Sequence, residues 1–251
     1  MSLGRSISIL LQGPAKAGKS TFASTSPKPM CYLDCEGGTR FLPITAVVWD
    51  PRTAPPEFDG TWDTAVVKIR NYDDATLAYQ WLQSGKHPFT SLVVDSISEL
   101  QQKLVDKISG RNQMQTQDWG EVFRNFMGML RDFRDLCENP IRPLTSVVLV
   151  AMSKTVDKGL KIPQLQGQSL TYLPYLFDVT AAAHVYTWRD EQQNQMTSFR
   201  LLVGPNDMYQ VGERVGGRIP AELENPTVPM ILDYVFGPET PAESTEPQAS
   251  A

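Results

Sequence analysis

Residues 13 to 20 read Gly13-Pro14-Ala15-Lys16-Ala17-Gly18-Lys19-Ser20 and match the pattern GxxxxGK[ST] in full. An apolar run, Ile7 to Leu11, precedes them, and Thr21-Phe22-Ala23 can continue a helix. Strand, loop and helix in this order form the context in which such a loop binds phosphate. A chance match in a glycine-bearing turn is the alternative, and it does not explain that order. We therefore expect residues 13–21 to bind a nucleoside triphosphate, with Lys19 on its β/γ-phosphates and Ser20 on Mg²⁺.

A second candidate for the same site is Asp95, which follows the apolar run Leu92 to Val94. The run predicts a buried strand, and ligands of α/β proteins bind at the carboxyl ends of strands. A carboxylate there is typical of the residue that holds Mg²⁺ together with the hydroxyl of the phosphate loop. We therefore expect Asp95 and Ser20 to share the metal.

Two further carboxylates end an earlier predicted strand, in the stretch Tyr32-Leu33-Asp34-Cys35-Glu36-Gly37-Gly38. A carboxylate at this end of the sheet can orient and deprotonate an attacking water, provided that it lies within hydrogen-bond reach. Glu36 is the candidate for this catalytic role, and Asp34 can instead cap the turn. The alternative for Glu36 is an ordinary surface residue before the glycine pair.

Strand-like runs alternate with helix-like segments up to residue 152, a pattern that predicts an α/β fold with a mostly parallel central sheet flanked by helices. The clearest helix carries an apolar stripe from Trp119 to Leu136 at a spacing of about 3.6 residues, which indicates a core face. Asn139-Pro140 ends it. The predicted strands are 6–12, 30–34, 45–49, 65–69, 90–95 and 145–152, with helices over 73–83, 97–108 and 119–136 and a loop over 50–63.

The pattern changes after residue 152. Residues 155–171 are polar and without a clear period, so we expect a long loop. Two antiparallel strands, 179–188 and 198–203, and a short helix, 228–235, follow. We expect one domain over residues 1–236 and a disordered acidic tail over 237–251, which holds three glutamates and no basic residue. The tail is either inert or a partner-binding segment.

Composition narrows the class of protein. With 251 residues, 41% hydrophobic and 20% charged, the chain is typical of a soluble globular protein. No apolar run reaches the ~20 residues that cross a membrane, and no signal peptide is evident, so we expect a cytoplasmic protein without a membrane partner. The net charge of −5 argues against wholesale wrapping by nucleic acid. Three cysteines and two histidines lack the spacing of a zinc site.

The loop with its Pro14, the strand end Leu33-Asp34-x-Glu36 and the strand end Val93-Val94-Asp95-Ser96 together resemble the RecA-like ATPases. Gln117-Asp118-Trp119-Gly120 and Phe177-Asp178 are similar to segments of the compact phage RecA-like ATPases of single-strand annealing and recombination. This resemblance spans about residues 5–220. It implies a RecA-like fold, ATP and Mg²⁺ as cofactors, and a homo-oligomer, either a ring or a filament.

The resemblance also implies two DNA-binding loops, placed by position at 109–118 and 155–169. The first contains Arg111 and the second contains Lys158 and Lys161, which suit phosphate contacts on single-stranded DNA. A plain solvated loop is the alternative for each. The implied partners are single-stranded DNA and a single-strand-binding or other recombination protein.

Two departures from the family pattern stand out. Family members hydrolyse ATP between subunits with a basic residue that reaches across the interface. Only Arg214 matches that stretch here, because Gly212 and Glu213 replace a Lys-Asp pair, and the alternative is a turn arginine. Where RecA proteins carry a γ-phosphate-sensing glutamine, this chain has Ser153 and Lys154.

These observations favour an ATPase that binds single-stranded DNA and supports phage recombination or strand annealing. The alternatives are another P-loop NTPase, such as a helicase loader or a packaging motor, and a nucleotide-gated assembly protein without useful turnover. No base-specific motif distinguishes ATP from GTP.

Overall fold

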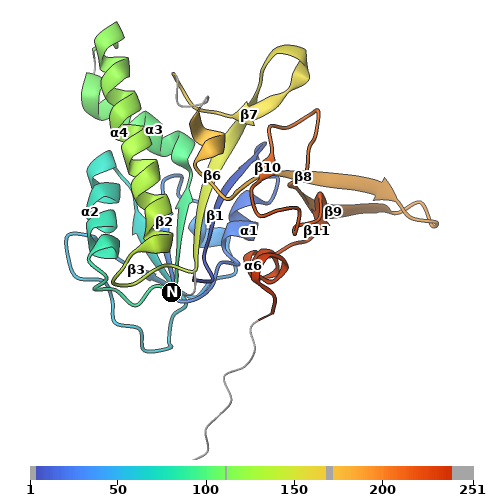
Figure 1. Cartoon of the computed structure of the whole chain (residues 1–251), viewed down its shortest axis with the longest axis horizontal. Helices are drawn as coiled ribbons and strands as arrows, with labels where there is room; N and C mark the ends of the chain where they lie inside the picture. Colours follow the sequence, from blue (N-terminus) through green and yellow to red (C-terminus); the bar gives the residue numbers. More distant parts are fainter. Residues whose placement is uncertain (1–3, 111, 168–171, 239–251) are drawn as a thin grey trace, which may run out of the picture.

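A computed structural model describes residues 4–110, 112–167 and 172–238 of the chain (Figure 1). Its centre is an eleven-stranded sheet with the main order β11-β9-β8-β1-β6-β5-β2-β4-β3. The strands from β3 to β8 along this order run parallel, and β9 and β11 continue the sheet antiparallel. The expected α/β architecture, with a mostly parallel sheet and C-terminal antiparallel strands, is therefore confirmed.

The strands of the sheet are short except at its centre and in one hairpin. They are β1 (Ile7–Gly13), β2 (Met30–Asp34), β3 (Ala46–Val48), β4 (Thr64–Lys68), β5 (Ser91–Asp95), β6 (Ser146–Thr155), β7 (Lys161–Pro163), β8 (Val179–Arg189), β9 (Gln195–Leu202), β10 (Gly212–Glu213) and β11 (Glu222–Glu224). The helices are α1 (Lys19–Ala23), α2 (Tyr72–Gln83), α3 (Ile97–Ser109), α4 (Thr116–Asp135) and α6 (Val228–Phe236), with 3₁₀ turns at Thr39–Phe41, Leu136–Glu138, Asp157–Gly159 and Leu173–Tyr175.

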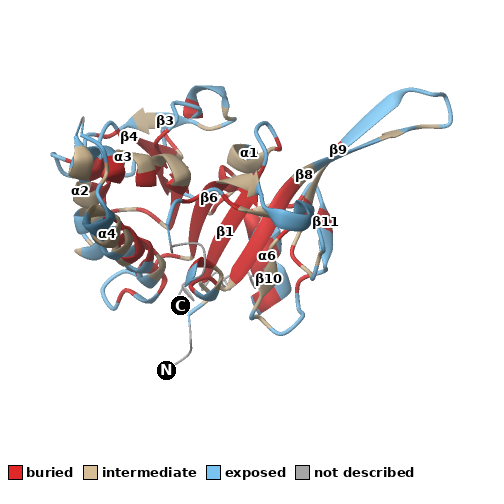
Figure 2. Ribbon diagram, turned by 90° about the horizontal axis from the view of Figure 1, so that it is seen from above, coloured by how far each residue is buried: buried red, intermediate tan, exposed pale blue. Residues whose placement is uncertain are grey.

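The sheet has an apolar core on each face, because its central strands are buried on both sides (Figure 2). Helices α2, α3 and α4 cover one face, and the predicted stripe of α4 contributes Phe126, Leu130 and Phe133 to that core. Helices α1 and α6 cover the other face through residues such as Phe22 and Ile231. Burial on both faces explains why the parallel strands read as continuous apolar runs.

Helix starts follow local capping chemistry. Asn71 and Asp74 form a reciprocal capping box at the start of α2. The side chain of Ser96 accepts a hydrogen bond from the backbone N–H of Glu99 at the start of α3. Both caps follow loops at the carboxyl ends of strands β4 and β5, so they fix the chain where it leaves the sheet.

Two expectations for the loops are wrong. Residues 161–163, predicted within a long loop, form strand β7, which pairs antiparallel with Ser153, Lys154 and Thr155 at the end of β6. A hairpin this short has no alternation of apolar and polar residues that sequence could reveal. The loop expected over 109–118 is also shorter, because α4 begins at Thr116.

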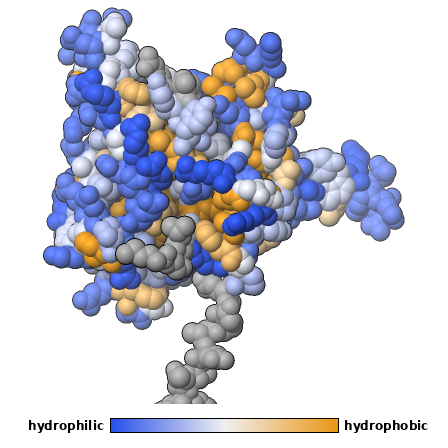
Figure 3. Space-filling model, viewed as in Figure 1, coloured by the Kyte–Doolittle hydropathy of each residue, from blue (hydrophilic) through white to orange (hydrophobic). Residues whose placement is uncertain are grey.

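Strands β8 and β9 form the hairpin that sequence predicted and extend beyond the body of the molecule as an arm (Figures 1 and 2). The tip of this arm, residues 190–194, is exposed or half-buried and hydrophilic (Figure 3). The base of β8 pairs in parallel with β1, next to the phosphate loop, a pairing that sequence did not reveal.

Of the tail expected to be disordered, residues 237–251, only Gly237 and Pro238 are described, and residues 239–251 lie outside the described part of the chain. Among the residues that the structure describes, no helix is long and apolar enough to span a membrane.

Candidate functional site: a phosphate loop at the carboxyl end of the sheet

The loop between β1 and α1 lies against the base of the β8–β9 arm. Gly18 has φ 83°, a left-handed conformation that favours glycine. A Cβ on Gly18 would lie 2.9 Å from the ring of Phe199, and one on Gly13 would lie 2.7 Å from the carbonyl oxygen of Ala183. Neighbouring strands therefore leave no room for a Cβ on either glycine, and the backbone conformation at Gly18 favours glycine as well.

The cationic side chain of the loop is folded back on the loop itself. Lys19 donates a hydrogen bond of 2.7 Å from Nζ to the carbonyl oxygen of Pro14. Burial lowers the pKa of Lys19, and the carboxylates of Asp95 and Glu36 oppose that shift. Its ammonium thus lies near both predicted acidic residues, as expected for one common site. Among the other residues of the predicted loop, Ala15, Lys16 and Thr21 are exposed and Ala17 is buried.

The register of the sheet brings Asp95 to Ser20. Ser20 donates a hydrogen bond from Oγ to Asp95 Oδ2. The phenol of Tyr32 donates a second hydrogen bond of 2.6 Å to the same carboxylate oxygen. Ser20 and Asp95, which sequence predicts to share a metal, are thus in direct contact, with an additional donor that sequence reasoning missed.

Glu36 lies beside this pair, because Asp34 and Asp95 are direct neighbours in the register of β2 and β5. Ser96 donates a hydrogen bond from Oγ to Glu36 Oε1. Partial burial is the largest cause that raises the pKa of Glu36, and the nearby Asp95 carboxylate adds to it. A raised pKa is the usual adjustment of a carboxylate that serves as a general base.

Asp34 holds the turn that carries Glu36. Its Oδ1 accepts hydrogen bonds from the backbone N–H groups of Glu36, Gly37 and Gly38, at 3.3, 2.7 and 3.2 Å. Its Oδ2 accepts from Lys68 Nζ, with which it forms an ion pair, and from the hydroxyl of Thr39 at 2.6 Å. The interpretation of Asp34 as the residue that caps the turn agrees with this geometry.

Opposing effects act on the Asp34 carboxyl. Burial, the largest single effect, would raise the pKa of Asp34. The hydrogen bonds from Lys68, Thr39 and Gly37 outweigh burial and hold that pKa below its ordinary value. Asp34 is therefore a structural carboxylate that stays ionised, whereas Glu36 is better suited to accept a proton.

The residues present fit a magnesium ion that is bound together with a nucleotide. Within the described part of the chain, no cluster of three or more His, Cys, Asp or Glu residues could hold a metal alone. Mg²⁺ commonly uses one or two protein ligands and takes others from phosphates and water. The hydrogen-bonded hydroxyl of Ser20 and carboxylate of Asp95 supply that small set.

The residues predicted to contact DNA are only partly brought together. Lys158 is exposed at the tip of the β6–β7 hairpin, with φ 62°. Lys161 donates a hydrogen bond to the Tyr209 hydroxyl at 3.3 Å and lies 4.8 Å from the centre of that ring. Arg111 lies outside the described residues. Of the two candidates that the structure describes, Lys158 is thus the exposed one, and Lys161 is held against an aromatic ring.

The hairpin begins beside the phosphate loop, because Met152 of β6 is paired with Gly13. Lys154, one of the two residues at the position of the sensing glutamine, donates from Nζ to the carbonyl oxygen of Leu165 at 2.9 Å. Ser153 is paired with Pro163. In this conformation Lys154 therefore stabilises the hairpin.

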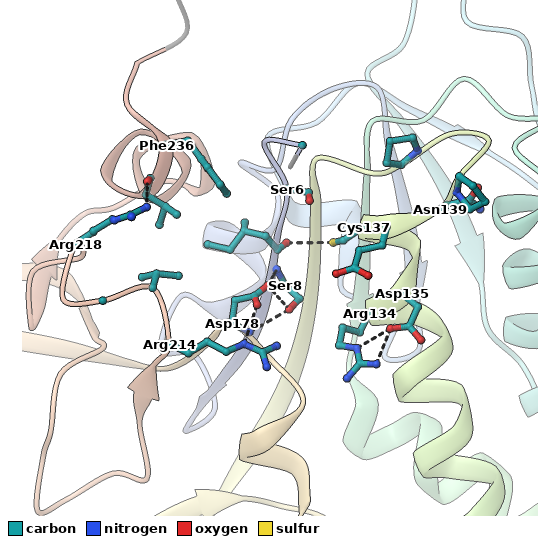
Figure 4. A pocket seen from close by; sticks show the side chains of 18 residues that line it. Ser6, Ser8, Arg134, Asp135, Cys137, Asn139, Asp178, Arg214, Arg218 and Phe236 are labelled. Carbon is teal, nitrogen blue, oxygen red and sulfur yellow. Dashed lines mark hydrogen bonds and ion pairs between the residues drawn. The ribbon is translucent and has the colours of Figure 1, made fainter. Parts of the chain in front are cut away.

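Arg214 lies at the other end of the sheet. Its Nε donates to Asp178 Oδ1 at 2.9 Å, and Asp178 is bonded to Ser8 near the start of β1 (Figure 4). Ser8 is five residues before Gly13 on the same strand, roughly 16 Å away. Arg214 and Asp178 line a cavity of about 1190 Å³, together with Arg134 and Arg218. Arg214 and the phosphate loop of the same chain are therefore not brought together.

Sequence reasoning missed Tyr32, Ser96, Lys68 and Phe199 as residues around the site. Tyr32, Ser96 and Lys68 contact the predicted residues across neighbouring strands, and only the register of a parallel sheet brings them together. Ser96 carried a usable signal, since it directly follows Asp95 at a helix start. Phe199 carried none, because it lies on a strand far along the chain.

Comparison with known proteins agrees with this geometry. No curated protein matches the chain. A solved structure described as a prototypical ATPase from the type III secretion system of pathogenic bacteria is 14% identical, with a TM-score of 0.43. That match covers 70% of this chain and 51% of the other, so this chain spans about half the length of that ATPase. A family profile described as an AAA domain matches residues 5–216. The phosphate loop, Asp95 and Glu36 all lie inside that match, and since it covers most of the chain, the protein belongs to this AAA domain family of P-loop ATPases.

Proposed function

We propose that the protein is a Mg²⁺-dependent ATPase that binds single-stranded DNA and acts in phage recombination or strand annealing. The observation that carries the ATPase part is the convergence of Lys19, the Ser20–Asp95 pair and Glu36 at one end of the sheet. A cation, a metal-ligand pair and a basic carboxylate are the parts that phosphoryl transfer to water needs.

Each residue has a distinct role in this proposal. Lys19 leaves its bond to Pro14 and binds the phosphates, where its charge offsets theirs. Ser20 and Asp95 hold Mg²⁺, which when bound neutralises negative charge on the phosphates. Glu36, oriented by Ser96, accepts a proton from the attacking water.

The DNA-binding part rests on the family resemblance and on the position of the β6–β7 hairpin. Lys158 at its tip is exposed and can contact a phosphate of a single strand. The hairpin adjoins the phosphate loop through the pairing of Met152 with Gly13. Nucleotide and DNA would then bind to connected segments of one chain.

Arg214 could act on a nucleotide only in a neighbouring subunit, because in its own chain it lies at the opposite end of β1 from the phosphate loop. In a ring or filament, Arg214 of one copy would approach the nucleotide of the next. Arg214→Ala would then lower hydrolysis in the assembled state and leave nucleotide binding by single copies unchanged. An equal loss at concentrations where the protein is monomeric would contradict a role between subunits.

The decisive experiment is ATP hydrolysis measured with single-stranded DNA, with duplex DNA and without DNA, each at two salt concentrations. We expect stimulation by single strands that weakens as salt rises, because phosphate contacts release counterions. Lys158→Ala should lower the slope of log affinity against log salt by about 0.7 for one lost phosphate contact on a single strand. Asp157→Ala, at the same hairpin tip, is the matched control.

Other outcomes favour other functions. Stimulation by duplex DNA with strand separation or translocation indicates a motor or a loader. Nucleotide-dependent assembly without turnover indicates a protein whose oligomer responds to binding alone. No affinity for single strands, with or without ATP, overturns the recombination proposal.

A further inference from the structure

The phenol of Tyr32 lies inside the core, directly beneath the proposed metal site. Tyr32 is in the middle of β2 and is only 1% exposed. It is paired with Val66 of β4 and Val93 of β5, so strands enclose it on both sides. Its hydroxyl donates a hydrogen bond of 2.6 Å to Asp95 Oδ2. Because this buried hydroxyl donates its proton to the Asp95 carboxylate, it constrains the orientation of that carboxylate.

The same carboxylate oxygen accepts the proton of Ser20. Because the Ser20 hydroxyl donates to Asp95, the lone pairs on its oxygen remain available for a cation. This orientation depends on Asp95 keeping one rotamer. Two donors converge on Oδ2, and the donor from Tyr32 is the one that is attached to the rigid centre of the sheet.

The phenol serves this site as a hydrogen-bond donor, since its hydroxyl proton is directed at Asp95 Oδ2. Its position on the central strand β2, between β4 and β5, fixes the point from which that hydrogen bond is made.

We propose that Tyr32 is a positioning residue for the metal, acting through Asp95 to hold the carboxylate and the Ser20 hydroxyl in the arrangement that binds Mg²⁺ with the nucleotide. This inference rests on the proposed nucleotide site. It concerns metal-dependent binding only, and it requires neither hydrolysis nor DNA. Partners that orient a metal ligand typically change metal affinity by about 10- to 100-fold when they are removed.

The test is the binding of a fluorescent ATP analogue to the full chain, titrated with MgCl₂ and repeated in EDTA. For Tyr32→Phe, which removes only the hydroxyl, we expect the Mg²⁺ concentration for half-maximal binding to rise about tenfold. Binding in EDTA should stay the same, because the lost bond acts on the metal site. Tyr72→Phe is the matched control, since that buried phenol donates instead to the carbonyl oxygen of Asn125, at 3.1 Å.

A double-mutant cycle with Asp95→Asn separates positioning from general loss of packing. If Tyr32 acts through Asp95, Tyr32→Phe adds little further change in Mg²⁺ dependence to the Asp95→Asn variant. Equal Mg²⁺ dependence of wild type and Tyr32→Phe overturns the inference, and so does an equal loss of binding in EDTA.

Thermal unfolding of each variant shows whether the fold is retained. If Tyr32→Phe does not fold, the Asp95→Asn variant alone still tests the inference. An Mg²⁺ dependence equal to that of the wild type in Asp95→Asn would show that the Asp95 carboxylate does not hold the metal, and Tyr32 could then not act through it. A wild type that binds no nucleotide overturns the proposed function itself.

Discussion

The two ends of the central sheet both gather charged side chains, and they differ in how those charges are balanced. At the amino end, around the cavity lined by Arg214, Arg134 is paired with Asp135 and Arg214 with Asp178 (Figure 4). At the carboxyl end, Lys19 is bonded to a carbonyl oxygen and Glu36 to a hydroxyl. Within the described chain, neither of these two has an ion pair. Each end also has the opposite case, since Arg218 donates to the carbonyl oxygen of Val235 at the amino end and Asp34 is paired with Lys68 at the carboxyl end. What sets the carboxyl end apart is that its cation without an ion pair in the described chain, Lys19, belongs to the phosphate loop.

Lys19→Ala should produce the largest effect if this comparison is correct. A hydrogen bond to a charged group contributes about 3 kcal/mol at most, which corresponds to about 100-fold in nucleotide affinity. Hydrolysis should fall below detection, because the same charge is lost from the transition state. Titration with a fluorescent nucleotide and a phosphate-release assay measure the two effects. Lys16→Ala, an exposed cation of the same loop, is the control, and equal losses in both variants would argue against a specific role for Lys19.

Glu36→Gln should lower hydrolysis by about 10²- to 10⁴-fold, the usual contribution of a general base, with nucleotide binding retained. In the wild type, the raised pKa of Glu36 implies that hydrolysis increases with pH through a midpoint above the ordinary glutamic acid value of about 4.3. The sign follows from the role, since only the deprotonated carboxylate accepts a proton. A pH profile of the steady-state rate checks this. If the fall in rate at low pH is unchanged in Glu36→Gln, a group other than Glu36 causes that fall.

Asp34→Asn should reduce stability, since it removes a charged acceptor from Lys68, Thr39 and the turn. We expect the free energy of unfolding at pH 7 to fall by about 2 kcal/mol, the scale of a hydrogen bond to a charged group. The folded-state pKa of Asp34 is depressed, so its stabilisation is present above the unfolded pKa and is lost as pH falls through the folded one. The difference between variant and wild type in urea unfolding should therefore shrink in acid. Asp59→Asn is the control, and we expect a smaller fall in the free energy of unfolding, because the exposed Asp59 carboxylate accepts hydrogen bonds from Thr61 and, among the residues that the structure describes, has no ion pair with a lysine like that of Asp34.

Arg134→Ala should have the smallest effect, because its ion pair with Asp135 is near the surface. Such pairs contribute about 0–1 kcal/mol, so the free energy of unfolding should change within that range. Nucleotide affinity should stay the same, since the amino end of the sheet has no part in the phosphate site. Nucleotide titrations of Arg134→Ala and Lys19→Ala check this. If both variants lost nucleotide binding, the two ends of the sheet would not differ in their role.

Sequence predicted the parts of the site that are contiguous in the chain. The loop of Lys19 and Ser20 and the strand end at Asp95 could be recognised because residue type and local order carry the chemistry. Tyr32 was not predicted, since its importance depends on which strands are neighbours. For the same reason, the parallel pairing of β8 with β1 was missed, although both strands were expected.

The fold was predicted where periodicity is long and failed where elements are short. The stripe of α4 spans several turns and was recognised, with a start at Trp119 that the structure moves to Thr116. Strand β7 has three residues, too few for a pattern to develop. Strands β10 and β11 were not predicted for the same reason.

The close contacts of Gly13 and Gly18 with the arm have a consequence for anyone who rebuilds this protein. The ring of Phe199 and the backbone of Ala183 occupy the space that a Cβ would need on either glycine. An arm transplanted from a relative would have to present the same small profile at these two points, or the transplanted strands would displace the loop. The phosphate loop and the hairpin therefore have to be exchanged together in any chimera, although Gly13 and Ala183 are 170 positions apart in the chain.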